Sequence, residues 1–126
     1  MMTWLKVYLK LAWACKTPLV LLADKRYKPV TEQQLALIIP AAKRAWKKTA
    51  YQVDLHDCDD STDIFKAEAS KKAENGVGRV YGLWSGRGLH YWSVVIKENG
   101  KVEMIEPQTG DRNRKWGKYI PFAVMI

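Results

Sequence analysis

Three residues in this chain have side chains that together could carry out nucleophilic chemistry. Cys58 follows Asp57, a residue type that favours a helix N-terminus, where free N–H groups stabilise a thiolate. His90 is one of only two histidines, and a nearby imidazole can take up a thiol proton. Glu106 could orient that imidazole and stabilise its protonated form. Cys58 alone could equally be a small buried side chain, so a triad requires that all three residues meet.

The spacing of His90 and Glu106 fits a single β-hairpin. We expect strands over 89–97 and 101–106, joined by the three-residue loop 98–100, which ends in a glycine suited to the left-handed position of a bulged hairpin. This register predicts three opposing pairs: Lys97 with Lys101, Trp92 with Glu106, and His90 with Gln108. His90 and Glu106 become same-face diagonal neighbours, about 7–8 Å apart at the backbone and within side-chain reach.

Two glutamines could help to bind an oxyanion beside the thiol. Gln52 precedes Cys58 by six residues, and Gln108 lies just beyond Glu106, so each could supply a hydrogen-bond donor. A surface glutamine is the alternative interpretation of both. His56 is a competing base for Cys58, but it lies just outside the expected helix and lacks an orienting carboxylate on a strand.

Acidic residues surround Cys58 closely in the sequence. Their negative charge disfavours a thiolate, and a bound hard cation with oxygen ligands would neutralise it. The acidic residues are Asp54, Asp57, Asp59, Asp60 and Asp63. Their spacing is not that of an EF-hand loop, and acids at a helix start also complement the helix dipole without any ion.

The elements that must position these residues indicate an α+β domain with helices first and strands later. We expect helices over 3–15 and 32–48, and a third helix that begins at Cys58. Thr31 with Gln34, and Asp57 with Asp60, form capping-box patterns, while Pro40 should kink or split the second helix. Further strands are expected over 19–22, 77–84 and 119–126. The whole chain, 1–126, is predicted to be one domain, with 1–18 as an N-terminal helical extension.

Composition limits the compartment and the partners. The chain has 126 residues and a net charge of +8, all of which comes from residues 1–50, because acids and bases balance in 51–126. This half could contact a polyanion, or simply form solvated helix faces. Two cysteines make no disulfide framework, and Lys6 and Lys10 interrupt the apolar N-terminus, so no membrane span is expected. We therefore expect a cytoplasmic protein.

Two motifs and the loop between them resemble a known family. The stretch 51–60 (YQVDLHDCDD), the loop with Gly82, Gly86 and Gly88 before His90, and the stretch 105–110 (IEPQTG) resemble the papain-like cysteine protease domains typified by the C-terminal domain of the Marasmius oreades agglutinin. Similar stand-alone sequences occur in phages and prophages, and a viral member would lie in the host cytosol. The resemblance covers roughly residues 19–126.

The resemblance implies a papain-like fold with N-terminal helices packed on a small antiparallel sheet. It also implies a Cys–His–Glu triad at Cys58, His90 and Glu106, a calcium requirement that involves Asp59 and Asp60, and hydrolysis of a peptide or isopeptide bond in a protein or peptide substrate. The alternative is an inactive protease-fold protein that binds a host protein or nucleic acid. Its basic N-terminal half, with Trp4, Trp13 and Trp46, would then make the contacts.

Overall fold

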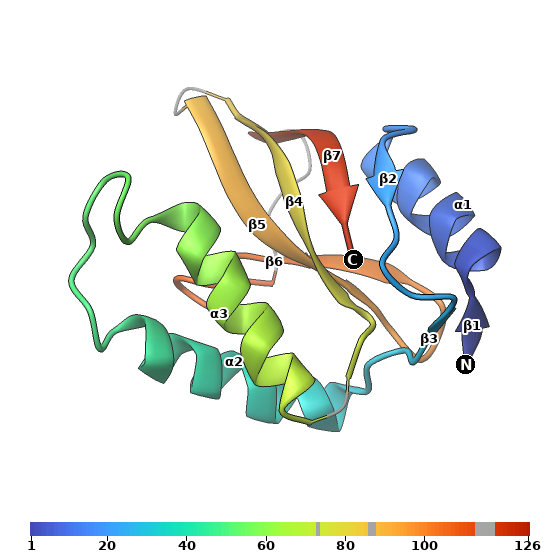
Figure 1. Cartoon of the computed structure of the whole chain (residues 1–126), viewed down its shortest axis with the longest axis horizontal. Coiled ribbons are helices and arrows are strands. Elements are labelled where there is room, and N and C mark those ends of the chain that lie inside the picture. Colours follow the sequence, from blue (N-terminus) through green and yellow to red (C-terminus); the bar gives the residue numbers. More distant parts are fainter. Residues whose placement is uncertain (73, 86–87, 113–117) are drawn as a thin grey trace.

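The computed structural model describes residues 1–72, 74–85, 88–112 and 118–126, and this part of the chain is an α+β structure (Figure 1). Its helices are α1 (Trp4–Cys15), α2 (Glu32–Trp46) and α3 (Cys58–Ser70). The main sheet has the order β2-β7-β4-β5-β6, with strands β2 (Val20–Leu21), β4 (Val77–Trp84), β5 (Gly88–Ile96), β6 (Val102–Ile105) and β7 (Tyr119–Met125). A separate two-stranded sheet pairs β1 (Met2–Thr3) with β3 (Arg26–Tyr27).

The α+β class predicted from the sequence is confirmed, but the expected antiparallel sheet is not. The strands β4, β5, β6 and β7 pair antiparallel, whereas β2 pairs parallel with β7, so the sheet is mixed. A hairpin turn can impose antiparallel pairing on strands that are close in sequence. No such turn links β2 to β7, because almost the whole length of the chain separates them. A connection this long allows the two strands to pair in parallel.

Local capping chemistry fixes where α2 and α3 begin. The Thr31 hydroxyl accepts a hydrogen bond from the backbone N–H of Gln34 at 3.1 Å, and the Gln34 side chain accepts one from the Thr31 N–H at 2.7 Å. At α3, the Asp57 N–H donates to the Asp60 carboxylate at 3.1 Å, and Cys58 is the first helical residue as predicted. Pro40 lies inside α2 without splitting it.

Two hydrophobic clusters lie on opposite faces of the main sheet. Even-numbered residues of β4 and β5, such as Val80 and Trp92, pack with Leu11 of α1. Odd-numbered residues, such as Val77 and Val95, pack with α2 and α3. Figure 1 shows α1 at the opposite end of the molecule from the start of α3. None of the helices in the described ranges is long and apolar enough to cross a membrane.

The hairpin between β5 and β6 has the predicted register. The Lys97 N–H donates to the Lys101 carbonyl at 2.8 Å, and Gly100 has a φ of 79°. Strand pairing continues to Ser93 opposite Ile105. The predicted pair of His90 with Gln108 is wrong, because the chain turns back after Glu106 and the Gly110 N–H donates to the Glu106 carbonyl at 2.7 Å. Pro107 has no N–H with which to continue the ladder.

A β-bulge interrupts the pairing of β4 with β7. The partner of Tyr81 is Ala123, but the partner of the next residue, Gly82, is Pro121, so Phe122 is the extra residue on β7. Bulges of this kind redirect a side chain. The Phe122 ring accordingly lies 6.0 Å from the Tyr81 ring, on the face of the sheet opposite α1.

Candidate ligand site at the start of helix α3

His90 and Glu106 form a buried hydrogen-bonded pair. The distance between His90 Nε2 and Glu106 Oε2 is 2.7 Å, and both side chains are buried. β5 supplies the histidine, and the turn after β6 supplies the carboxylate, so the hairpin register alone brings the two groups together. The other carboxylate oxygen, Oε1, is buried without a hydrogen-bond partner in the described part of the chain. A buried oxygen without a partner raises the free-energy cost of burying the carboxylate, unless a ligand or a water molecule donates a hydrogen bond to it.

Cys58 completes this cluster from the first turn of α3. Its side chain is half-buried and interacts with the His90 ring. Burial of His90 disfavours its protonated form, but the interactions with Cys58 and Glu106 outweigh burial and raise the pKa of His90 to about 9. At neutral pH the ring is therefore an imidazolium. The three groups that the sequence singled out do meet, and they can share a proton between sulfur and imidazole.

Aromatic rings enclose the other sides of His90. The ring centroids of Trp84, Trp92 and Tyr119 lie 5.2, 6.0 and 6.1 Å from the centroid of the imidazole. Rings at these distances exclude water and can attract a cation through their faces. The His90 imidazolium thus contacts the Glu106 carboxylate on one side and three aromatic rings on its other sides.

His56, the competing base predicted for Cys58, packs against Trp46 in the structure. The His56 ring stacks on Trp46 with centroids 4.0 Å apart, and its Nε2 lies 3.2 Å from the Trp46 carbonyl oxygen. Trp46 itself is buried, so it cannot be the contact residue expected of it in a binding protein. The prediction for Trp46 is wrong because α2 turns this side chain toward the core.

Neither glutamine lies on a strand or helix. Gln52 is exposed in a tight turn, in which its N–H donates to the His56 carbonyl at 3.0 Å and its own carbonyl accepts from the His56 N–H at 2.7 Å. Gln108 lies in the turn that follows Glu106. A contact of either residue with a ligand stays a prediction. Of the glycines expected before His90, Gly88 begins β5 with a φ of 90°, and Gly86 lies outside the described residues.

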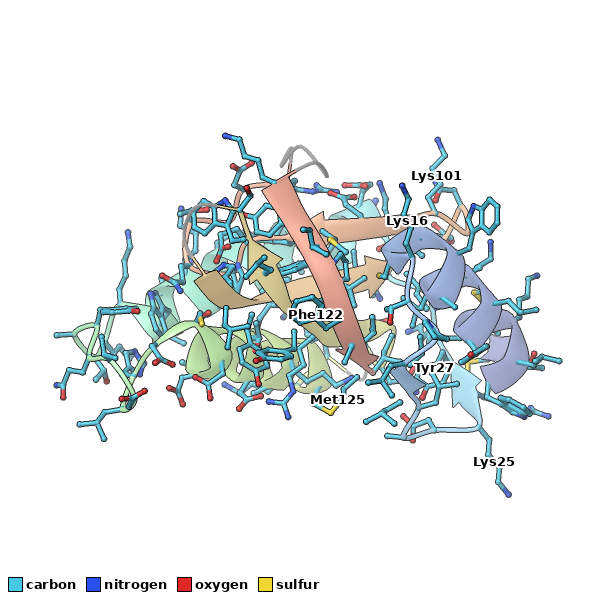
Figure 2. All side chains as sticks on the ribbon, turned by 90° about the horizontal axis from the view of Figure 1, so that it is seen from above. Lys16, Lys25, Tyr27, Lys101, Phe122 and Met125 are labelled. Carbon is cyan, nitrogen blue, oxygen red and sulfur yellow. The ribbon has the colours of Figure 1, made fainter. Side chains whose placement is uncertain are left out.

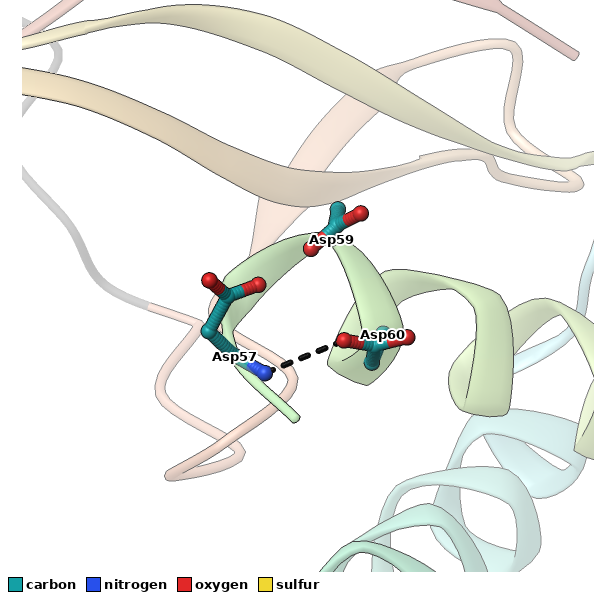
Figure 3. A group of neighbouring side chains, drawn as sticks. All are labelled: Asp57, Asp59 and Asp60. Carbon is teal, nitrogen blue, oxygen red and sulfur yellow. Dashed lines mark hydrogen bonds between the residues drawn. The ribbon is translucent and has the colours of Figure 1, made fainter. Parts of the chain in front are cut away.

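Three carboxylates gather at the first turn of α3 (Figure 3). One oxygen from each of Asp57, Asp59 and Asp60 lies within 4.8 Å of the others. A hydrogen bond between Asp57 and Asp59 lowers the pKa of Asp57 and raises that of Asp59. Carboxylate oxygens suit a hard cation such as Ca²⁺, although Asp57 and Asp60 already accept backbone hydrogen bonds from Asp54 and Asp57. A calcium role for Asp59 and Asp60 therefore stays a prediction.

A partly exposed apolar and aromatic surface, which was not predicted from the sequence, lies beside this cluster. It is the part of the odd-numbered face of the sheet that α3 leaves uncovered. Leu83 pairs with both Leu89 and Ile120 across three strands, while the Tyr81 ring contacts the rings of Tyr91 and Phe122. We call these residues the open face: Tyr81, Leu83, Leu89, Tyr91, Ile120 and Phe122. Figure 2 shows Phe122 on β7. The apolar residues on both faces of β4 could have indicated this surface. However, a run of apolar residues on both faces is also typical of a strand that is buried on both sides.

Polar groups border the open face on the α3 side. Burial raises the pKa of the Tyr91 phenol, and Tyr81 and Asp59 nearby raise it further. Arg79 acts in the opposite sense and also pairs with Asp63 of α3. Cys58 also contributes to the pKa of Tyr91. The open face therefore adjoins the Cys58 cluster rather than standing apart from it.

Two solved structures resemble nearly the whole chain. PSL1a in its complex with E64 matches with a TM-score of 0.80 and 23% identity, covering 99% of this chain and 51% of that chain. Polyporus squamosus lectin bound to the human-type influenza-binding epitope Neu5Aca2-6Galb1-4GlcNAc matches with a TM-score of 0.79 and 22% identity, covering 99% of this chain and 49% of that chain. This chain spans about half of each, and at such identity the likeness shows the fold alone. No protein-family model and no curated protein matches.

These comparisons correct several predictions made from the sequence. One of the two similar structures is of a lectin, and neither a family model nor a curated relative supports a protease domain. The predictions of a papain-like cysteine protease family, hydrolase activity and a peptide substrate are therefore not borne out by what the chain resembles and are withdrawn, and nothing supports a phage origin. Motifs such as Asp57–Asp60 fix a helix start and a local geometry, which a fold can keep while its function differs. The comparisons favour the alternative of a binding protein.

Proposed function

We propose that this chain is a carbohydrate-binding protein whose ligand lies on the open face of the sheet. The observation that carries the proposal is the set of contacting rings formed by Tyr81, Tyr91 and Phe122 on an uncovered sheet surface. Exposed apolar surfaces of this kind mark binding sites in soluble proteins. The carbohydrate bound by the structurally similar lectin makes a sugar the first ligand to consider.

The chemistry of a sugar ring fits such a surface. One face of a pyranose carries mainly C–H bonds, which pack on the face of an aromatic ring, while its hydroxyl groups point outward at the edges. Tyrosine suits this contact, because it combines an apolar ring with a polar tip. The leucine and isoleucine side chains of the open face extend the apolar floor beyond the rings.

Hydrogen-bonding groups beside Tyr91 would orient the sugar. Asp59 can accept from hydroxyl groups, and the Arg79 guanidinium, held by its pair with Asp63, can donate to them. A ligand site of a few placed polar groups around an apolar floor is the usual arrangement for small molecules. We propose that Cys58, with His90 and Glu106 behind it, closes the α3 end of this site.

Titration with oligosaccharides tests the proposal. The trisaccharide Neu5Aca2-6Galb1-4GlcNAc and a set of neutral oligosaccharides would be added to the chain in a calorimeter. Tyr91→Ala is expected to weaken binding about tenfold, the loss typical of one aromatic contact. Tyr51→Ala is the matched control, because Tyr51 is an exposed tyrosine that packs on Trp46 instead. Failure of every saccharide to bind, or an equal loss in both variants, would overturn the proposal.

The basic residues of 1–50, which were predicted to contact a polyanion, form two separate groups in the structure. Four basic residues gather at the C-terminal end of α2, where Lys43, Arg44 and Lys47 line a hollow. The remaining basic residues of this half belong to α1 and the segments beside it, at the other end of the molecule (Figure 1). The predicted contact is therefore proposed for each end separately. Heparin binding across a salt series would show how many charges take part.

A further inference from the structure

Helix α1 is apolar on two opposite sides. Its inner stripe, formed by Val7, Leu11 and Cys15, is buried in the core. We call the residues Leu5, Leu9 and Trp13 the outer stripe; they recur every four residues and are all exposed, with Trp13 87% exposed. A helix that is apolar all round is normally covered all round. The outer stripe therefore calls for an occupant from outside the described chain.

The charges beside the outer stripe indicate the character of that occupant. Lys6 flanks the stripe on the helix itself, and Lys16 directly follows its last turn. Lys10 also lies beside the stripe, but its ammonium donates to the Gly100 carbonyl oxygen at 2.8 Å. α1 contains no acidic residue. Figure 2 shows the Lys25 and Lys101 side chains projecting from the same end of the molecule. The occupant must combine an apolar interior with a negatively charged surface.

A second copy of the chain does not meet this requirement. Pairing two outer stripes face to face would bring the lysines of both helices together, and like charges at an interface cost free energy. The net charge of +8 adds to this repulsion. A lipid bilayer with anionic headgroups satisfies both needs at once, because the headgroups neutralise lysine while the acyl region takes the apolar side chains.

We propose that α1 docks this protein on an anionic membrane surface. The helix lies parallel to the bilayer, with Leu5, Leu9 and Trp13 at the boundary between headgroups and acyl chains. Tryptophan is the side chain that suits this boundary. Lys6 extends its apolar stem along the same surface and places its ammonium group among lipid phosphates. The inner stripe keeps the helix attached to the protein core. This contact does not involve the open face.

Vesicle binding tests the proposal directly. The intact chain would be mixed with vesicles of pure phosphatidylcholine, and with vesicles in which about a third of the lipid is phosphatidylglycerol. Binding is expected to the anionic vesicles, together with a blue shift in tryptophan fluorescence that Trp13→Phe abolishes. Lys6→Gln should weaken binding about fivefold, the effect of one charge near such a surface. Leu9→Ser should weaken it about tenfold through lost apolar burial.

Two matched variants control for general effects of charge and polarity. Leu37 on α2 is 59% exposed, against 58% for Leu9, and Lys72 is an exposed lysine just beyond α3 that belongs to neither basic group. Leu37→Ser and Lys72→Gln should leave vesicle binding unchanged. Equal losses in these controls, or no binding to anionic vesicles, would refute the proposal. A concentration-dependent dimer that Leu9→Ser dissociates would instead assign the outer stripe to a second copy and would also overturn it.

Discussion

The buried pair of His90 and Glu106 predicts that the protein loses stability as the pH rises above neutral. The pKa of His90 is raised to about 9, against about 6.5 for an unperturbed histidine. The folded state therefore holds the proton more tightly than the unfolded chain does. One unit of pKa corresponds to about 1.4 kcal/mol, so a rise of about 2.5 units contributes at most about 3 to 4 kcal/mol to the free energy of unfolding.

The sign of the pKa change sets the pH window. Because the folded-state pKa is the higher one, the stabilisation is complete below about pH 6.5, where the unfolded chain is protonated as well. It is lost progressively as the pH rises and is gone above about pH 9. The free energy of unfolding should therefore fall across this interval, which urea denaturation at a series of pH values can measure.

Glu106→Gln isolates the contribution of the carboxylate. The substitution keeps the shape of the side chain but removes its charge, so the pKa of His90 should fall and the alkaline loss of stability should shrink. Glu103→Gln is the matched control. Glu103 lies on the same hairpin but pairs with Lys97 and Arg112, which lower its pKa and place its effect at acid pH.

Imidazole NMR signals give a second measurement of the same prediction. The chain has only two histidines, so the His90 resonance can be identified by its loss in His90→Asn. Its titration midpoint should lie near 9 in the unmodified chain and lower in Glu106→Gln. Constant stability between pH 6.5 and 9, or the same alkaline slope in both glutamate variants, would refute the assignment of a protonated His90 held by Glu106.

Two further perturbations test the surroundings of the site. If Asp59 and Asp60 bind calcium, Ca²⁺ should raise the thermal midpoint of the unmodified chain in calorimetry but not that of Asp59→Asn, and an unchanged midpoint in both would remove the calcium prediction. Gly82→Ala should cost about 2 kcal/mol or more in urea denaturation, because its Cβ would lie 2.3 Å from the Ile120 carbonyl oxygen. Gly88→Ala should cost only about 1 kcal/mol, because it meets no nearby atom and strains only a positive φ. Equal losses would contradict this distinction.

Local signals in the sequence predicted the elements that hold His90, Cys58 and Glu106. The start of α3 at Cys58 follows from Asp57 and Asp60, which act over a single helical turn. The register of the β5–β6 hairpin follows from a glycine at its turn. Such signals succeed because each depends on residues only a few positions apart. They placed the imidazole beside the carboxylate before any long-range contact had to be known.

Long-range pairing could not be predicted in the same way. Val20 pairs with Val124, more than a hundred positions later, and no turn residue announces a parallel partner at that distance. The bulge at Phe122 depends equally on how β4 meets β7. The open face was missed for this reason, because its residues come from three strands. Function was misjudged because the motif around Cys58 fixes a local geometry and not the use made of it.

The alternation of side chains along β5 links the two parts of the candidate site. His90 and Trp92 point toward the core on the α1 side, while Tyr91 between them belongs to the open face. Cys58 interacts with the first of these faces through His90 and affects the second through Tyr91. If a ligand binds at Tyr91 as proposed, it is expected to alter the surroundings of Cys58 and, through Cys58, the pKa of His90. Because linkage is reciprocal, ligand affinity should then depend on pH over the range in which His90 titrates, and an affinity independent of pH would contradict a link between the two faces.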